Sequence, residues 1–232
     1  MILAHLRRLQ PTQRHSKDNT SGNAMIYVLL AIALFGILTA TLSSQNNQSD
    51  GQDIDDEMVA LYANGLIEYA AAAKNVVDQM IMTGSTIDDL DFINPTSAGF
   101  DTPPHIHKVF HPQGGGLNYT TPSSPPFVDD TNEGWYIIKN THIEWTPTTA
   151  DDVVITAFKV EKSICSLINE KISGDPTIPV HTQAGYGMYS HFVDGSNDFT
   201  TLECPQCEGY PSFCVESTDG TQWAFYSILA GR

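Results

Sequence analysis

The stretch 53–84, DIDDEMVALYANGLIEYAAAAKNVVDQMIMTG, determines how the rest of the chain can fold. Apolar side chains recur in it at steps of three and four residues, the spacing of an amphipathic helix. The positions are Met58, Leu61, Tyr62, Leu66, Tyr69, Ala73, Val76, Val77 and Met80. Acidic residues from Asp53 to Glu57 suit the positive end of the helix dipole, and Gly84 is placed as a C-cap. The sequence therefore predicts a hinge and amphipathic helix over 45–84, with an apolar stripe that must pack on the remaining chain.

An uncharged segment lies upstream of this helix. The nineteen residues 24–42 span about 28 Å as a helix, close to the hydrocarbon thickness of a bilayer. Four basic residues precede it: Arg7, Arg8, Arg14 and Lys17. The next basic residue is Lys74, so the positive-inside rule places residues 1–22 in the cytoplasm and the chain after Leu42 outside it. We therefore expect a single-pass membrane protein with a cytoplasmic N-terminus and an exported C-terminal domain.

Three interpretations of the N-terminus stay open. An ordinary secretory signal would be removed after its apolar region. An uncleaved signal anchor requires only the apolar segment and the charge bias. The third interpretation rests on Ser21 and Gly22, which stand directly before the apolar run. This arrangement resembles a prepilin leader, which is cut on the cytoplasmic side after the glycine while the apolar segment is retained.

Residues 85–232 are predicted to form one globular α+β domain. Its first half is rich in Pro and Gly and is expected to form loops around a short strand near Ile106–Phe110. The stretch 135–145, WYIIKNTHIEW, alternates as a half-buried strand does. The residues that this alternation places on one face are Trp135, Ile137, Thr141, Ile143 and Trp145.

The second half of this domain alternates between strand and helix patterns. Residues 152–160, DVVITAFKV, are apolar on both faces and predict a more central strand, while 161–172, EKSICSLINEKI, predict a helix. Two later segments, 185–193 and 221–229, are expected to be strands. The fold class is therefore α+β, in which a long N-terminal helix with a membrane half and an amphipathic half packs on a mostly antiparallel sheet.

Four cysteines follow the predicted central strand: Cys165, Cys204, Cys207 and Cys214. An even number in an exported domain suggests two disulfides with three possible pairings. A bridge from Cys165 to the late cluster would close a loop of about 40–50 residues and stabilise the fold by about 3–4 kcal/mol. A four-cysteine zinc site and a thioredoxin-like use of CPQC (204–207) are the alternatives.

Two further groups of residues are weak metal candidates. In HIHKVFH, His105 and His107 share a face of the expected strand with His111 nearby, which can hold zinc or copper, although a solvated histidine-rich edge has the same pattern. In DGSND, Asp194 and Asp198 resemble the start of a calcium loop, but Pro205 stands where the bidentate Glu is required. We therefore expect no cofactor, with calcium the one ion worth testing.

The composition of the chain and the absence of catalytic motifs exclude several classes of function. The chain has 11 basic and 27 acidic residues, a net charge of -16, which argues against nucleic acid as a partner. No nucleophile elbow, phosphate loop, HExxH or dinucleotide fingerprint occurs. The adjacent acids at 129–130 and 151–152 lie in turn-rich contexts and are expected to be solvated. We therefore predict that the protein is not an enzyme.

The leader with Gly22, the apolar helix and its amphipathic extension resemble type IV pilins and the pseudopilins of type II secretion. The tract 134–172 resembles the type IVb branch in particular, and a late cysteine cluster fits that branch. The resemblance implies a structural subunit that a prepilin peptidase cuts after Gly22, with N-methylation at Asn23. The resemblance also implies a bacterial inner-membrane location with a periplasmic domain. An inner-membrane assembly platform would extract the subunit into an extracellular pilus, where helix 23–44 would pack against other subunits. The packing residues are Ala24, Tyr27, Phe35, Gly36 and Leu42.

Two residues depart from the family pattern. With Asn23 as the first mature residue, the fifth is Tyr27, where major pilins have a glutamate, and Asn23 itself is unusual at the first position. These departures favour a minor or tip subunit over the bulk one. The alternative function is an uncleaved, membrane-anchored extracytoplasmic module for binding or adhesion.

Overall fold

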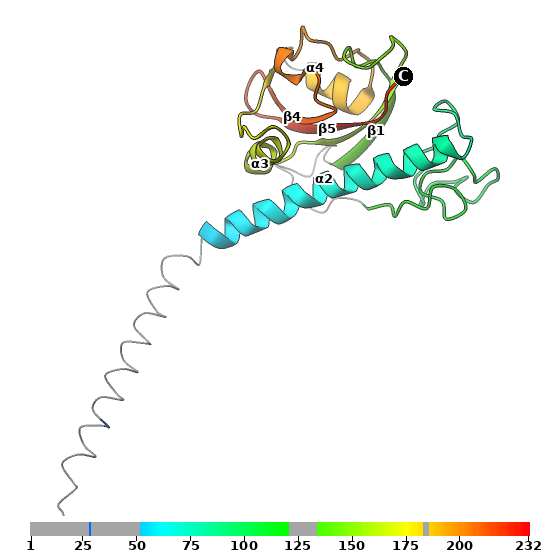
Figure 1. Ribbon diagram of the computed structural model, residues 1–232, viewed down its shortest axis with the longest axis horizontal. Helices are drawn as coiled ribbons and strands as arrows, with labels where there is room; N and C mark the ends of the chain where they lie inside the picture. Colours follow the sequence, from blue (N-terminus) through cyan, green and yellow to red (C-terminus); the bar gives the residue numbers. More distant parts are fainter. Residues whose placement is uncertain (1–27, 29–51, 121–133, 183–185) are drawn as a thin grey trace, which may run out of the picture. The chain divides into compact units, whose positions relative to one another are not determined.

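The computed structural model describes residues 28, 52–120, 134–182 and 186–232. The chain divides into two units, Met1–Asp53 and Ile54–Arg232. The second unit contains the sheet, the helices that cover it and the long loop 83–120 (Figure 1). In the first unit, Val28 is helical and exposed.

Helix α2 (Gln52–Met82) is the long helix that the sequence predicts, and it has 31 residues. Its buried positions follow steps of three and four residues: Ala63, Leu66, Ala70, Ala73, Val77 and Met80. The predicted stripe is wrong at its N-terminal end, because Met58 and Leu61 are 41% and 63% exposed. Gly84 takes a φ of 111° just after the helix, and its amide donates to the Ile81 carbonyl, which confirms the C-cap.

In the part of the chain that the structure describes, five strands form one mixed sheet: β1 (Gly134–Thr141), β2 (Asp152–Phe158), β3 (Val180–His181), β4 (Ser212–Ser217) and β5 (Trp223–Ala230). Their spatial order is β1-β2-β5-β4-β3. The pairs β1–β2, β2–β5 and β4–β5 are antiparallel, whereas the short β3 is parallel to β4. All seven residues of β2 are buried, which confirms a central strand at 152–158.

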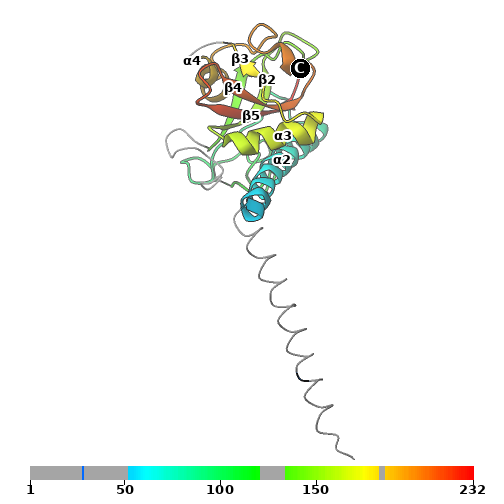
Figure 2. The ribbon, with the colours of Figure 1, turned by 90° about the vertical axis from the view of Figure 1, so that its left-hand side faces the viewer.

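The two faces of the sheet carry separate cores. Helices α2 and α3 (Lys162–Ser173) cover one face, where Ile155 and Phe225 pack with Leu66 and Ile168 (Figures 1 and 2). The segment after β3 covers the other face with α4 (Tyr186–Tyr189) and the π-helical turn η1 (Ser190–Asp194). Helix α3 is the helix predicted from EKSICSLINEKI.

The loop between α2 and β1 is attached to α2 and to itself by buried contacts. A Cβ on Gly115 would approach the Val76 Cγ1 to 2.6 Å and the Met80 Sδ to 2.8 Å, so only glycine fits against the helix there. The Lys108 ammonium is buried and donates to three backbone carbonyls, those of Gly99, Phe100 and Thr102, at 2.6, 2.8 and 2.5 Å. These three acceptors compensate for removing the charge from water.

Three predicted strands differ in the structure. Near Ile106–Phe110 there is no strand; an isolated bridge joins Asp91 to Lys108. The strand expected over 135–145 ends at Thr141, and its register with β2 shifts between Ile138 and Thr141. Trp135 packs against the core on one face of the sheet, whereas Ile143 belongs to the core on the other face. The prediction that these two residues share a face is therefore wrong.

The third difference concerns the strand predicted over 185–193. Its described part forms α4 and the start of η1 instead of a strand. The buried residues Met188, His191 and Phe192 stand three and four residues apart, which is a helical spacing. The strand predicted at 221–229 is confirmed as β5, whereas the pattern analysis missed β4.

Candidate functional site

The predicted processing and packing residues lie outside the part of the chain that the structure describes. They are Gly22, Asn23, Ala24, Tyr27, Phe35, Gly36 and Leu42. The leader predicted over 1–22 and nearly all of the helix predicted over 23–44 fall in the same region. Among the helices at described positions, none is long and apolar enough to cross a bilayer.

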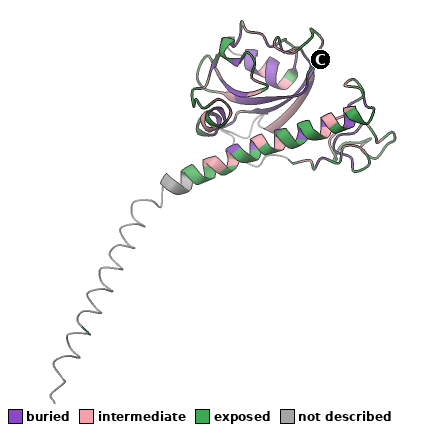
Figure 3. Cartoon of the chain, viewed as in Figure 1, coloured by how far each residue is buried: buried purple, intermediate pink, exposed green. Residues whose placement is uncertain are grey.

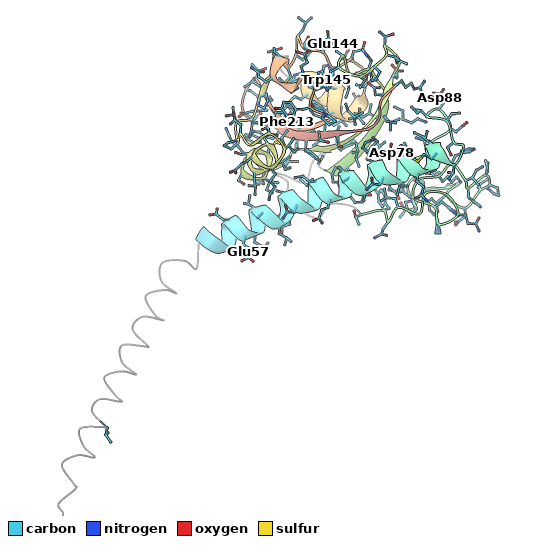
Figure 4. All side chains as sticks on the ribbon, in the orientation of Figure 1. Glu57, Asp78, Asp88, Glu144, Trp145 and Phe213 are labelled. Carbon is cyan, nitrogen blue, oxygen red and sulfur yellow. A yellow bond between two sulfur atoms is a disulfide. The ribbon has the colours of Figure 1, made fainter. Side chains whose placement is uncertain are left out.

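The described chain resumes at Gln52, the first residue of α2. From residue 56 to residue 62 no side chain of α2 is buried, and Glu57, Met58 and Leu61 are exposed (Figures 3 and 4). Farther along, Val77 and Met80 are buried against the domain. One helix therefore belongs to the core at its C-terminal half and presents apolar side chains to the surroundings at its N-terminal end.

The four cysteines form two disulfides, Cys165–Cys214 and Cys204–Cys207. The first attaches α3 to β4 across 49 residues, and the second closes the CPQC turn, whose 3-10 helix η2 is Pro205–Cys207. With the sulfurs paired, thiolates for a four-cysteine zinc site are absent. The turn also lacks the helix that follows CxxC in thioredoxin-like sites.

The Cys165–Cys214 connection is reinforced by a buried amide. The Asn169 Nδ2 donates to the Cys214 carbonyl at 2.9 Å and to the Thr177 carbonyl at 3.1 Å. The Cys214 amide in turn donates to the Asn169 Oδ1 at 2.8 Å. Asn169 thus binds the backbone of β4 as a neighbouring strand would, one turn of α3 after Cys165.

The three candidate histidines do not converge. The rings of His105 and His111 are stacked with centroids 4.0 Å apart, while the His107 Nδ1 lies 2.9 Å from the Ser85 Oγ. Burial, then His111 and Lys108, lower the pKa of His105. Over the described ranges, no group of three His, Cys, Asp or Glu side chains is arranged to hold a metal ion.

The acidic candidates are also separate. Asp194 and Asp198 are exposed, and the Asp198 Oδ1 accepts the His142 amide at 3.2 Å. Asp152 was expected to be solvated, but it is fully buried. Its carboxylate accepts the Ile143 amide, the Thr146 hydroxyl and the Arg232 amide at 2.8, 2.9 and 3.0 Å. It holds the start of β2 to the end of β5, which is a structural role.

A pocket of about 550 Å³ lies beside the CPQC turn. Residues between 173 and 182 form one side, Pro205 and Gln206 form another, and Tyr210 and Phe213 form the aromatic part of its lining. No sequence pattern predicts this pocket, because its walls come from segments about 30 residues apart. The β3–β4 pairing and the disulfides bring these segments together.

Two aromatic donors, the half-buried Trp145 and the buried Tyr226, position Tyr210. Its carbonyl accepts the Trp145 Nε1–H and the Tyr226 hydroxyl, each at 3.1 Å, and its ring stacks on Phe213 with centroids 4.5 Å apart. Burial raises the pKa of Tyr226 far above its usual range, so its hydroxyl stays a donor. These contacts therefore hold Tyr210, in the aromatic part of the lining, in one position.

Comparisons with family models, curated proteins and solved structures find no match to this chain.

Proposed function

We propose that this protein is a structural subunit, and not an enzyme, of a type IV pilus or type II secretion-like filament. The observation that carries the proposal is the division of α2 into a packed C-terminal half and an uncovered N-terminal end with Met58 and Leu61 exposed. A helix of this kind can join a globular domain to a helical bundle of other subunits. The apolar residues 24–42 would supply the upstream part of the packing surface.

The proposed maturation uses Gly22. A prepilin peptidase of the inner membrane cuts after it, the new terminal amine of Asn23 is methylated, and an assembly platform extracts the subunit from the bilayer. Tyr27 replaces the glutamate that pairs with a neighbour's terminal amine in major pilins. An unpaired carboxylate is costly in a bilayer, and its absence suits a subunit added once, at the tip or as a minor component.

The test is the intact mass and N-terminal residue of the membrane-extracted chain, expressed with and without a matching prepilin peptidase. We expect a peptidase-dependent start at Asn23, lost in Gly22→Val and retained in the neighbouring control Ser21→Ala. A start at Met1 in both cultures would refute the proposal in favour of an uncleaved anchored binding module. A start just after Leu42 would instead identify an ordinary secreted domain.

A second test concerns the exposed end of α2. Leu61→Asp places a charge on the surface proposed for subunit packing, and we expect it to reduce incorporation into sheared filaments without lowering the melting temperature. Asn64→Asp is the matched control, since Asn64 is exposed on the same helix and already polar. Equal incorporation of the two variants would exclude this end of α2 from the subunit interface.

A further inference from the structure

The Cys204–Cys207 disulfide constrains the two residues between its cysteines, and both of them line the pocket. Loop-closure entropy grows with the number of enclosed residues, so a bridge across three positions stabilises the fold about half as much as Cys165–Cys214 does across 49. Both sulfur atoms belong to buried residues, while Pro205 and Gln206 between them are exposed and line the pocket. The bridge therefore fixes one wall of the pocket.

The facing aromatic part is fixed independently. The Tyr210 backbone is held by the Trp145 and Tyr226 donors, and its ring is held by Phe213. A pocket with rigid walls on two sides loses little conformational entropy when a ligand enters. Its volume of about 550 Å³ lies within the range of about 300–1,000 Å³ that is usual for small-ligand sites.

The lining indicates the chemistry of the ligand. Asp175 is its single charged residue, and no Lys, Arg or His belongs to the described residues that line it. In a chain of net charge -16, such a site disfavours anions. The exposed side chains of Asp175, Thr177 and Gln206 offer a carboxylate, a hydroxyl and an amide next to an aromatic surface.

We propose that this pocket binds a neutral saccharide. The apolar C–H face of the sugar ring lies against the aromatic part at Tyr210, and its hydroxyls form hydrogen bonds with Gln206 and Asp175. A proline-containing peptide is the other ligand that aromatic-lined grooves take, but it needs backbone partners more than the side-chain carboxylate and amide available here. The site goes beyond the proposed filament function and does not depend on it.

The experiment is saturation-transfer NMR on the full chain in micelles of a zwitterionic detergent without a sugar head group. The probes are glucose, galactose, N-acetylglucosamine and their β-linked disaccharides. We expect transfer to the ring protons of at least one probe. Gln206→Ala should weaken binding about two- to tenfold through the loss of one hydrogen bond. No transfer to any probe, or stronger transfer to a proline-rich peptide that no sugar displaces, would overturn the proposal.

Two matched substitutions locate the signal. Val180→Trp places a large ring at a 44% exposed position that lines the pocket, and it should abolish transfer. Leu202→Trp adds the same ring at a position that is 82% exposed and outside the lining, and it should leave transfer unchanged. Cys204→Ala with Cys207→Ala should keep the fold but weaken binding. Full binding by Val180→Trp would overturn the assignment of the site, and full binding by the double alanine variant would overturn the disulfide's effect on it.

Discussion

Removing the Cys165–Cys214 disulfide measures how strongly α3 holds β4. The two cysteines are fully buried, with Cα atoms 5.5 Å apart, and Asn169 attaches the same strand one turn later. We choose the double substitution Cys165→Ala and Cys214→Ala, because alanine leaves no buried hydroxyl without a partner. The matched control is Cys204→Ala with Cys207→Ala.

The expected magnitudes follow from the sizes of the two loops. In the chain-entropy account, a bridge across 49 residues is worth about 4 kcal/mol and a bridge across three residues about 2 kcal/mol. For a domain of this size, 1 kcal/mol corresponds to about 2–4 °C in melting temperature. The Cys165/Cys214 variant should therefore lose about 8–16 °C, and the Cys204/Cys207 variant about half as much.

The assay is urea unfolding of the full chain in zwitterionic micelles, followed by tryptophan fluorescence and paired with thermal unfolding. The three tryptophans lie on or beside the sheet, so their emission reports its disruption. Equal losses for the two double variants, or the larger loss for Cys204/Cys207, would refute the argument that loop length sets the contribution of each bridge. A free energy of unfolding that does not fall in the Cys165/Cys214 variant would refute it too, because removing a constraint on the unfolded chain must favour that state.

Three further predictions concern single polar side chains. Asn169→Ala leaves both backbone groups of Cys214 unpaired and should cost about 3 kcal/mol in the free energy of unfolding, measured by urea titration. Lys108→Met deprives three carbonyls of their donor, so amide hydrogen exchange should accelerate across 99–111 while the sheet amides keep their protection. Because the folded-state pKa of His105 is lowered, its contribution to stability is present above about pH 6.5 and is lost as the pH falls toward that lower value. His105→Phe should remove this part of the acid sensitivity in thermal unfolding between about pH 7.5 and 5.

The first two of these predictions have control variants at exposed residues of α3. Glu170→Ala, exposed beside Asn169, should leave the unfolding free energy nearly unchanged, as should Lys171→Met. For the pH series the wild type is the reference. Hydrogen bonds from Thr201 lower the pKa of Glu144, so its stabilisation is also lost in acid, but equally in both proteins. An identical pH profile for His105→Phe and wild type would contradict the assignment to His105.

The sequence predicts the parts of the fold in which burial is regular. Helix α3 and strands β2 and β5 bury the residues that their periodicity indicates. Prediction fails where tertiary contacts override the pattern. Leu61 has the spacing of a core residue but lies before the first buried position, Ala63, and no sequence pattern shows where the sheet stops covering the helix.

The pocket is harder to predict than the fold, for a physical reason. Its walls depend on which cysteines pair, and four cysteines allow three pairings that sequence cannot distinguish. They also depend on β3, whose two residues are too few for a periodic signal. The polar character of the lining becomes visible only after Gln206 and Asp175 are brought to the same place.

The position of β5 governs the order in which the domain can form. This strand lies between β2 and β4, yet it follows both of them along the chain. A chain that emerges N-terminus first therefore carries β1–β2 and β3–β4 as two halves with no shared strand until residues 223–230 arrive. Cys204, Cys207 and Cys214 all emerge before that moment, so an oxidant meets three neighbouring thiols while the sheet that sorts them is incomplete. Yield in an oxidising compartment is therefore expected to depend on disulfide isomerisation as much as on the final stability.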